Sequence, residues 1–102
     1  MLSNPRTTVF LSAASVWEIA IKANLGKIAV ETTLEEITIE EPARNGIRSL
    51  PITREHACYT GKLPPYHRDP FDRILVAQAR LQGLTIVTRD PVFSQYDVSL
   101  FW

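Results

Sequence analysis

Strand-type and helix-type segments alternate along this chain, and the alternation restricts its fold more than any other feature. Four segments are rich in β-branched, aliphatic or aromatic residues and are predicted to be strands: 7–11 (TTVFL), 47–52 (IRSLPI), 84–88 (LTIVT) and 97–101 (DVSLF). Helical patterns separate them. This order predicts an α/β fold with a mainly parallel sheet and right-handed crossover connections. LTIVT does not alternate between polar and apolar residues, so we expect it to be buried on both faces.

Local signals set the ends of the predicted helices. Ser12 is placed to cap a helix over 13–25, and Gly26 follows as the residue past its end. A second helix is expected over 34–45. Pro42 should kink or split it, because proline lacks an N–H donor and its ring clashes with the preceding turn.

The segment HRDPFDRILVAQAR contains the clearest helix start in the chain. Asp69 fits the N-cap position and Pro70 the first helical position, and Gly83 lies just past the expected end. Capping alone explains Asp69, since an N-cap side chain contributes about 1 kcal/mol. Asp72, at the third helical position, favours the helix dipole. Two acids three residues apart nevertheless raise the question of a second role.

Composition limits the class of protein but does not name a partner. The chain has 102 residues, so a single domain is expected. Its 45% hydrophobic and 22% charged residues argue against disorder. Basic and acidic residues number 11 each, so no global field indicates a nucleic-acid partner. A local basic rim remains open, because four arginines lie near the capped helix: Arg68, Arg73, Arg80 and Arg89.

The cysteine content and hydropathy predict a cytoplasmic protein. Cys58 is the single cysteine, so no internal disulfide can form, which fits a reducing compartment. The most apolar window, VFLSAASVWEIAIKANL, is interrupted by Glu18 and Lys22. These charges disqualify it as a membrane span, so no membrane partner is expected.

Three acids from distant parts of the chain are predicted to meet at one edge of the sheet. Asp72 begins the helix before LTIVT, and Asp90 comes two residues after Thr88, where that strand ends. Glu18 lies in the second turn of the helix that follows TTVFL. All three positions fall at the carboxyl edge, where open α/β sheets bind ligands. Each acid has a simpler explanation, such as a cap or, for Glu18, an ion pair with Lys22 worth about 0.3–0.5 kcal/mol. Their shared location does not follow from those explanations.

Clustered carboxylates indicate a divalent metal, because they repel one another unless a cation offsets their charge. Hard oxygen ligands suit Mg²⁺ or Mn²⁺ rather than zinc. His56, Cys58 and His67 lack the spacing of a zinc site, and His67 is interpreted as a loop hydrogen-bonding residue or a substrate contact. A carboxylate-held metal with arginines nearby predicts phosphodiester hydrolysis, in which the metal polarises the phosphate and lowers the pKa of an attacking water. The arginines would position the backbone without reading its sequence.

Three segments together resemble the PIN-domain nucleases, specifically the VapC-type toxins of toxin–antitoxin pairs: SAASVWEIAIK, LPPYHRDPFDRILVAQA and IVTRDPVF. The similarity runs from about Thr7 to the end of the chain. It implies a three-layer α/β/α fold over residues 1–102 and a Mg²⁺- or Mn²⁺-dependent endoribonuclease that cleaves cellular RNA. It also implies a cognate antitoxin as protein partner and an assembly of dimers.

The resemblance also assigns site residues. Glu18 matches the acid of the WEIAIK motif, Asp72 the acid that opens the D-x-x-x-x-A-x-A helix, and Asp90 the acid after the VT strand. These three are the implied catalytic residues and metal ligands. Five further residues are candidates for supporting the acids or contacting the substrate: Asp69, Thr88, Arg73, His67 and Ser12.

The chain departs from the family pattern at its beginning. The family starts with a strand that carries an aspartate, often LLDTH, in the middle of the sheet, whereas this chain begins MLSNPRTTVF. We therefore expect a partial PIN domain that lacks the central first strand and one metal ligand. The strands at 7–11 and 84–88 would then have unpaired backbone edges. Unpaired edges predict a homodimer or higher oligomer, or low stability.

Three functions compete on these observations. The first is the metal-dependent toxin ribonuclease. The second is a catalytically inactive PIN remnant that binds an antitoxin or an intact homologue, and the missing first aspartate is the feature that favours it. The third is a metal-dependent phosphatase for small substrates, which the lack of a nucleophilic aspartate on a leading strand disfavours.

Overall fold

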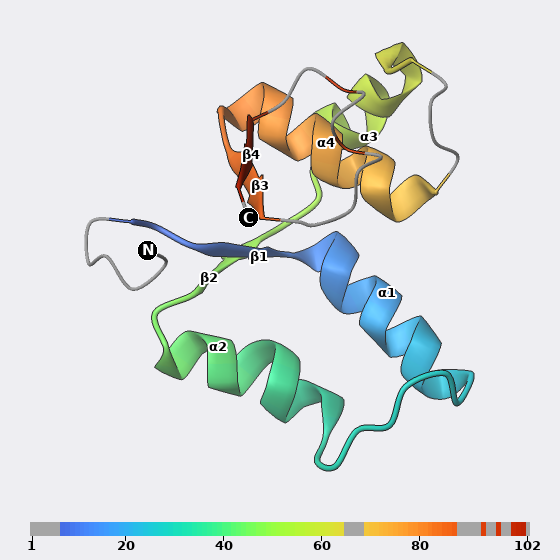
Figure 1. The fold of residues 1–102 in the computed structure, drawn as a ribbon, viewed down its shortest axis with the longest axis vertical. Helices are drawn as coiled ribbons and strands as arrows, with labels where there is room; N and C mark the ends of the chain where they lie inside the picture. The colour runs from blue at the N-terminus through green and yellow to red at the C-terminus, as the bar shows by residue number, and fades with distance from the viewer. Residues whose placement is uncertain (1–6, 65–68, 88–92, 94–95, 97–98, 102) are drawn as a thin grey trace. The chain divides into compact units, whose positions relative to one another are not determined.

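The computed structural model describes residues 7–64, 69–87, 93, 96 and 99–101. The chain divides into two compact units, Met1–Pro51 and Ile52–Trp102, which we call the first and the second unit. Figure 1 shows the helices and strands of each. No described helix is long and apolar enough to cross a membrane.

The first unit begins with a strand that leads directly into a helix. Strand β1 (Phe10–Ser12) is followed by α1 (Ala13–Asn24). The Ser12 hydroxyl accepts a hydrogen bond from the Ala14 N–H at 3.1 Å, which satisfies one of the donors left open at a helix start. Gly26 has a φ of 73°, a conformation that glycine adopts without steric cost. The predicted N-cap and the predicted position of the glycine past the helix are confirmed.

The predicted second helix forms, and its first part is a wide π turn. Element η1 (Glu36–Glu40) is π-helical and continues into α2 (Glu41–Arg44). Within it the Glu41 N–H donates to the Glu36 carbonyl, five residues back. The wider turn comes directly before Pro42, whose ring would clash with the carbonyl four residues earlier in a regular α-helix. The disturbance expected at this proline is therefore a π-helical segment ahead of it.

The two described strands of the first unit pair in parallel. Strand β2 (Arg48–Leu50) pairs with β1, with Phe10 opposite Arg48 and Ser12 opposite Leu50. The helices between them form the crossover that a parallel pair needs. Both strands are three residues long, shorter than the sequence predicted.

The second unit repeats the alternation of helix and strand. Helix α3 (Arg54–Tyr59) runs into a 3₁₀ turn, η2 (Thr60–Lys62). Helix α4 (Pro70–Gln82) precedes β3 (Thr85–Val87), which pairs in parallel with β4 (Ser99–Phe101).

Helix α4 has the ends that its sequence predicts. The Asp69 carboxylate accepts hydrogen bonds from the N–H groups of Phe71 at 2.9 Å and of Asp72 at 3.5 Å. Pro70 takes the first helical position, where its missing N–H costs nothing. Gly83 closes the helix with a φ of 65°, and the Leu84 N–H donates to the Ala79 carbonyl at 2.9 Å.

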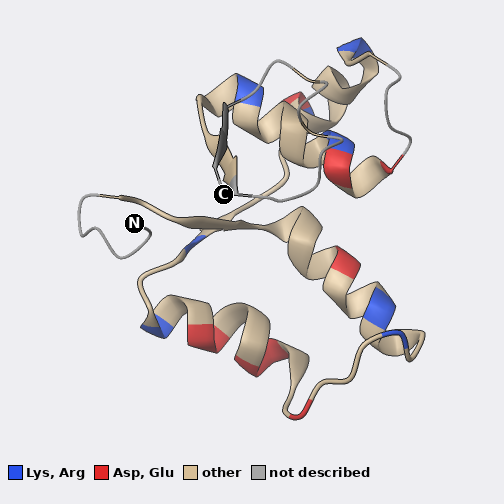
Figure 2. Ribbon diagram, in the orientation of Figure 1, with Lys and Arg blue, Asp and Glu red and all other residues tan. Residues whose placement is uncertain are grey.

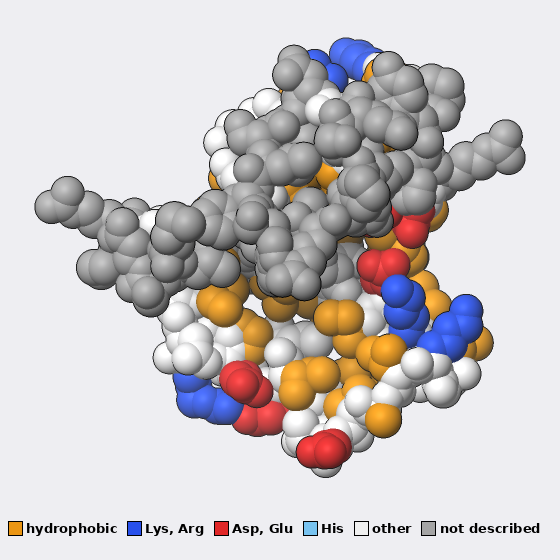
Figure 3. All heavy atoms as spheres, viewed as in Figure 1, with side chains coloured by type: hydrophobic (Ala, Val, Ile, Leu, Met, Phe, Trp, Pro, Cys, Tyr) orange, Lys and Arg blue, Asp and Glu red, His pale blue; other side chains and the backbone are white. Residues whose placement is uncertain are grey.

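The units differ in how they bury apolar side chains. The second unit has a core cluster of Leu63, Val76, Phe93 and Tyr96, against which Tyr59, Leu75 and Ile86 pack. In the first unit, Ala14 and Leu50 are buried, whereas several larger apolar side chains are exposed: Phe10, Trp17, Ile21, Leu25, Ile28 and Ile39. Figure 3 shows hydrophobic side chains across the face of the first unit that carries α1 and α2.

The predicted fold class is confirmed, since helices alternate with strands and both recorded strand pairs are parallel. The described strands form two sheets of two strands each, β1–β2 and β3–β4. Within the described ranges, each strand therefore has a neighbour on one side only. The helix predicted after Asp90 lies outside the described residues.

Candidate active site

Asp72 lies in the first turn of α4, where the sequence placed it. Its side chain is half-buried. The hydrogen bonds that begin this helix go to the neighbouring carboxylate of Asp69, so the helix start does not depend on Asp72 as its cap. The positive end of the helix dipole also reduces the cost of holding two carboxylates so close together.

Glu18 lies in the middle of α1 and forms the ion pair that its sequence predicted. Its Oε2 is 3.4 Å from the Lys22 Nζ, and the two side chains are 29% and 48% exposed. A pair this exposed stabilises a helix by about 0.3–0.5 kcal/mol. Glu18 therefore has a structural partner, and a metal ion at this carboxylate would compete with the Lys22 ammonium group.

The convergence of the three acids stays a prediction. Glu18 belongs to the first unit and Asp72 to the second. Asp90, Thr88 and His67 lie outside the described residues. Within the part of the chain that is described, no group of three or more histidine, cysteine or acidic side chains is close enough to hold a metal ion.

Arg73 follows Asp72 and binds backbone carbonyl groups. Its guanidinium group donates to the carbonyls of Thr60 at 2.6 Å, Pro64 at 3.0 Å and Leu63 at 3.3 Å. These bonds join the segment after α3 to the first turn of α4. A planar group with five donors suits this arrangement, which a lysine cannot reproduce. Arg73 thus joins residues 60–64 to the first turn of α4.

The two remaining supporting candidates act as helix caps. The Ser12 side chain is buried and caps α1 through its hydroxyl. The Asp69 carboxylate caps α4, which is the structural role that the sequence favoured for it. Capping accounts for both residue types without a substrate.

Sequence reasoning did not anticipate the role of His56. The buried imidazole completes a capping box with Thr53: its Nδ1 accepts from the Thr53 N–H at 3.0 Å, and the Thr53 hydroxyl accepts from the His56 N–H at 3.2 Å. Its Nε2 is 2.7 Å from the Gln82 Oε1. Because Nδ1 accepts, Nε2 carries the proton and donates to Gln82. The Thr-x-x-His spacing was the available signal, since glutamate or glutamine usually fills that position.

An acidic pair on the first unit has shifted pKa values. The pKa of Glu36 is lowered by a hydrogen bond with Glu40 and by the Arg44 guanidinium, and the pKa of Glu40 is raised by the same neighbouring carboxyl of Glu36. Arg44 donates a hydrogen bond to the Glu36 Oε1. Figure 2 shows acidic positions along η1 and α2. The cluster is open to solvent, and an internal cation already balances it, so it is a surface ion-pair network.

Parallel strands joined by helices give the chain an α/β fold, in which Asp69 caps α4 and Asp72 lies in the first turn of that helix. A family model described as the PIN domain matches residues 2–99, and the chain belongs to the PIN domain family. PIN domains are generally metal-dependent nucleases that act on RNA or DNA. A search among curated proteins found no match.

The chemistry of the predicted site fits the divalent metal that PIN nucleases typically use. Glu18 and Asp72 offer carboxylate oxygens, which are hard ligands of the kind that Mg²⁺ and Mn²⁺ prefer. Neither residue lies in a described group of cysteine and histidine ligands that would favour zinc.

Proposed function

We propose that this chain is a Mg²⁺- or Mn²⁺-dependent endoribonuclease of the VapC type, the toxin of a toxin–antitoxin pair. Its substrate is RNA, and its cognate antitoxin holds it in check. Membership of the PIN family supports nuclease chemistry. The choice of RNA and the toxin role rest on the resemblance of three motifs, around Glu18, Asp72 and Asp90, to VapC-type sequences. The proposed cytoplasmic location rests on the single cysteine and on the charges that interrupt the most apolar window.

The observation that carries the proposal is that Asp69 caps α4, so that Asp72 is not needed for this role. Asp69 makes the capping bonds of α4, and Pro70 fills the first helical position. The start of α4 is thus complete without a carboxylate at the third position. An acid there that is not needed as the cap suits a ligand for a cation, at a helix end that tolerates negative charge.

In the proposed site, Glu18, Asp72 and Asp90 hold the divalent metal through their carboxylates. The metal, when bound, polarises the scissile phosphate and lowers the pKa of an attacking water. The Lys22 ammonium group would compete with the metal for the Glu18 carboxylate. Arg73 binds the carbonyls of Thr60, Leu63 and Pro64 and so joins residues 60–64 to the helix that carries Asp72.

RNA cleavage by the purified chain with Mn²⁺, with and without EDTA, tests the proposal. Glu18→Gln and Asp72→Asn keep size and remove charge, and each should lower the cleavage rate by roughly 100-fold or more, because a ligand to the catalytic metal is lost. Glu31→Gln in the exposed loop after α1 is the matched control and should cleave at the wild-type rate. Asp69→Asn preserves a good cap and should lose at most about tenfold. Cleavage that survives both site variants and EDTA would end the proposal.

A second function is favoured by the exposed apolar surface of the first unit. Trp17 and Ile39 are 57% and 60% exposed, and both line a cavity of about 420 Å³ between α1 and the η1–α2 helix. Apolar surface of this kind marks sites of protein interaction. The alternative is thus an inactive PIN remnant that binds an antitoxin or an intact homologue. It predicts no cleavage under any metal condition.

Self-association of the chain is expected for both the ribonuclease and the inactive remnant. Each described strand has one neighbour, so strand edges remain for pairing with another chain. Sedimentation of the purified chain should give the mass of a dimer or a larger assembly. A stable monomer at all concentrations would remove this part of the proposal.

A further inference from the structure

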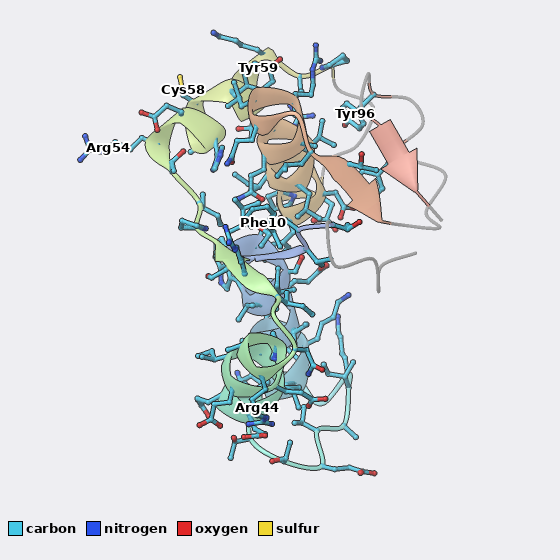
Figure 4. All side chains as sticks on the ribbon, turned by 90° about the vertical axis from the view of Figure 1, so that its left-hand side faces the viewer. Phe10, Arg44, Arg54, Cys58, Tyr59 and Tyr96 are labelled. Carbon is cyan, nitrogen blue, oxygen red and sulfur yellow. The ribbon has the colours of Figure 1, made fainter. Side chains whose placement is uncertain are left out.

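Two cationic side chains lie near the same aromatic ring on the second unit. The Lys62 Nζ lies 6.0 Å from the centre of the Tyr59 ring, and the Arg80 guanidinium carbon lies 5.7 Å from it. Tyr59 ends α3, Lys62 ends η2, and Arg80 lies in the last turn of α4. Figure 4 shows Tyr59 on the same end of the unit as Cys58.

The folded chain holds these two charges near each other. The Tyr59 ring is half-buried and packs against the core cluster of the second unit, so it is a fixed platform. Both cationic side chains are exposed. Since each lies within about 6 Å of one ring centre, their charged groups are no more than about 12 Å apart. The ring attracts each cation modestly, and the two cations repel one another.

No described acid neutralises this pair. The ion pairs of the described residues join Lys22 to Glu18 and Arg44 to Glu36, on the first unit. The acid on α3 is Glu55, and its pKa is lowered by hydrogen bonds to its own backbone and to Thr53. Lys62 and Arg80 therefore present two positive charges without a described counter-ion.

We propose that Lys62 and Arg80, each within about 6 Å of the centre of the Tyr59 ring, form a binding site for the phosphodiester backbone of RNA. A guanidinium group matches a phosphate with two parallel donors, and an ammonium group adds a mobile point charge. The inference rests on the proposed function and extends it, because it names a surface that holds the substrate away from the acids. Asp72 and Arg80 are eight residues apart on α4, or about 12 Å along its axis. A strand on this surface can run along the helix toward Asp72.

Binding of a fluorescent single-stranded RNA in EDTA, measured against salt concentration, tests the site without cleavage. The double variant Lys62→Gln/Arg80→Gln should lower the slope of log affinity against log salt by about 1.4, since each lost phosphate contact on a single strand removes about 0.7. At 0.1 M salt the affinity should fall by roughly 25-fold. Lys27→Gln/Arg48→Gln removes the same two residue types from the first unit and should bind RNA as the wild type does.

Further arms keep the outcomes separate. The swap Lys62→Arg/Arg80→Lys keeps both charges and should retain the wild-type salt slope. A retained slope would show that the glutamine variant binds less because it lacks the charges and not because it is misfolded. In the cleavage assay the double glutamine variant should raise KM and leave kcat unchanged. An unchanged salt slope in the double glutamine variant would overturn the site. The site would also be overturned if polyglutamate displaced the fluorescent RNA as effectively as unlabelled RNA does, because the surface would then suit an acidic protein. If the unaltered chain does not cleave RNA but the double glutamine variant lowers the salt slope as expected, the nuclease proposal fails and the RNA-binding site stands.

Discussion

The two units have the same alternation of helix and parallel strand but differ in what stabilises them. The second unit buries Val76 and Ala77 completely and has a cluster of larger apolar side chains around them. Among the described residues the first unit leaves Trp17 more than half exposed and buries only two apolar side chains, Ala14 and Leu50. Short strands with a correct local pattern therefore do not suffice to make a core. We expect stability to reside in the second unit.

The largest expected difference between the units is in the free energy of unfolding lost when one leucine in each is replaced by alanine. Leu63→Ala removes a side chain that is 6% exposed from the core cluster, and it should cost about 2–5 kcal/mol of the free energy of unfolding. Leu25→Ala removes a side chain that is 60% exposed at the end of α1 and should cost less than about 0.5 kcal/mol. Urea denaturation followed by circular dichroism measures both. Equal losses would show that the first unit depends on apolar packing as much as the second.

A smaller difference in stability between the units is expected when a polar side chain is removed from each. His56→Ala removes the hydrogen bonds to Thr53 and Gln82 that connect α3 to the end of α4, and it should cost about 1–3 kcal/mol because the imidazole is buried. Thr33→Ala removes one exposed hydrogen bond to the Glu36 N–H and should cost about 0.5–1 kcal/mol.

Thermal denaturation and hydrogen exchange of the α3 amides check this contrast. His56→Ala should speed exchange in α3, and Thr33→Ala should leave α3 unchanged. The opposite ranking of the two variants would mean that the His56 link does not hold the helices together.

Backbone conformation should not distinguish the units. Gly83 in the second unit and Gly26 in the first have φ values of 65° and 73°, and a Cβ at either position meets open space. Alanine at each should therefore cost about 1 kcal/mol, from the left-handed conformation alone. Gly61→Ala is the control, because Gly61 is outside that region and has the same open space, and it should not destabilise. Denaturation midpoints that differ strongly between the first two variants would contradict this expectation.

The smallest effect concerns pH and the exposed cluster of the first unit. The lowered pKa of Glu36 supplies stability at neutral pH that is lost as the pH falls through the folded value. The raised pKa of Glu40 acts in the opposite direction, since its contribution is lost as the pH rises through the folded value. The two contributions have opposite signs, and water screens charges this exposed, so stability should change little.

Carboxyl NMR titration measures the two groups directly. Glu36 should titrate below the ordinary range and Glu40 above it. Arg44→Gln should move the pKa of Glu36 upward, because one of the charges that holds it down is removed. Lys27→Gln serves as the charge-matched control and should leave both pKa values in place. An unmoved Glu36 in Arg44→Gln would show that the ion pair does not form in solution.

The ends of α4 were predictable from the sequence because capping is local. Asp69, Pro70 and Gly83 act within a few residues of their own positions, and the structure has each in its predicted role. The lengths of the two strands in the first unit were overestimated, since a strand extends only as far as its neighbour pairs with it. The π turn before Pro42 was foreseen only as a disturbance, because its form depends on how the preceding turn adapts.

The candidate site was predictable in its parts. The ion pair of Glu18 with Lys22 follows from their spacing, and the position of Asp72 follows from the cap before it. The meeting of Glu18, Asp72 and Asp90 depends on tertiary arrangement, which no local pattern determines. The contacts of Arg73 were missed for the same reason, since the carbonyl groups that it binds are at least nine residues away in the sequence.

Iron-mediated cleavage of the protein backbone tests the central claim most directly. When hydrogen peroxide and ascorbate are added, Fe²⁺ bound in place of Mg²⁺ reduces the peroxide to hydroxide and a hydroxyl radical, and the radical cuts the chain next to the metal. If Glu18 and Asp72 hold one ion, mass spectrometry should find cuts near both residues, excess Mg²⁺ should suppress both, and Asp72→Asn should abolish both together. Cuts near one residue alone, or cuts near Glu18 that persist in Asp72→Asn, would contradict a shared metal site.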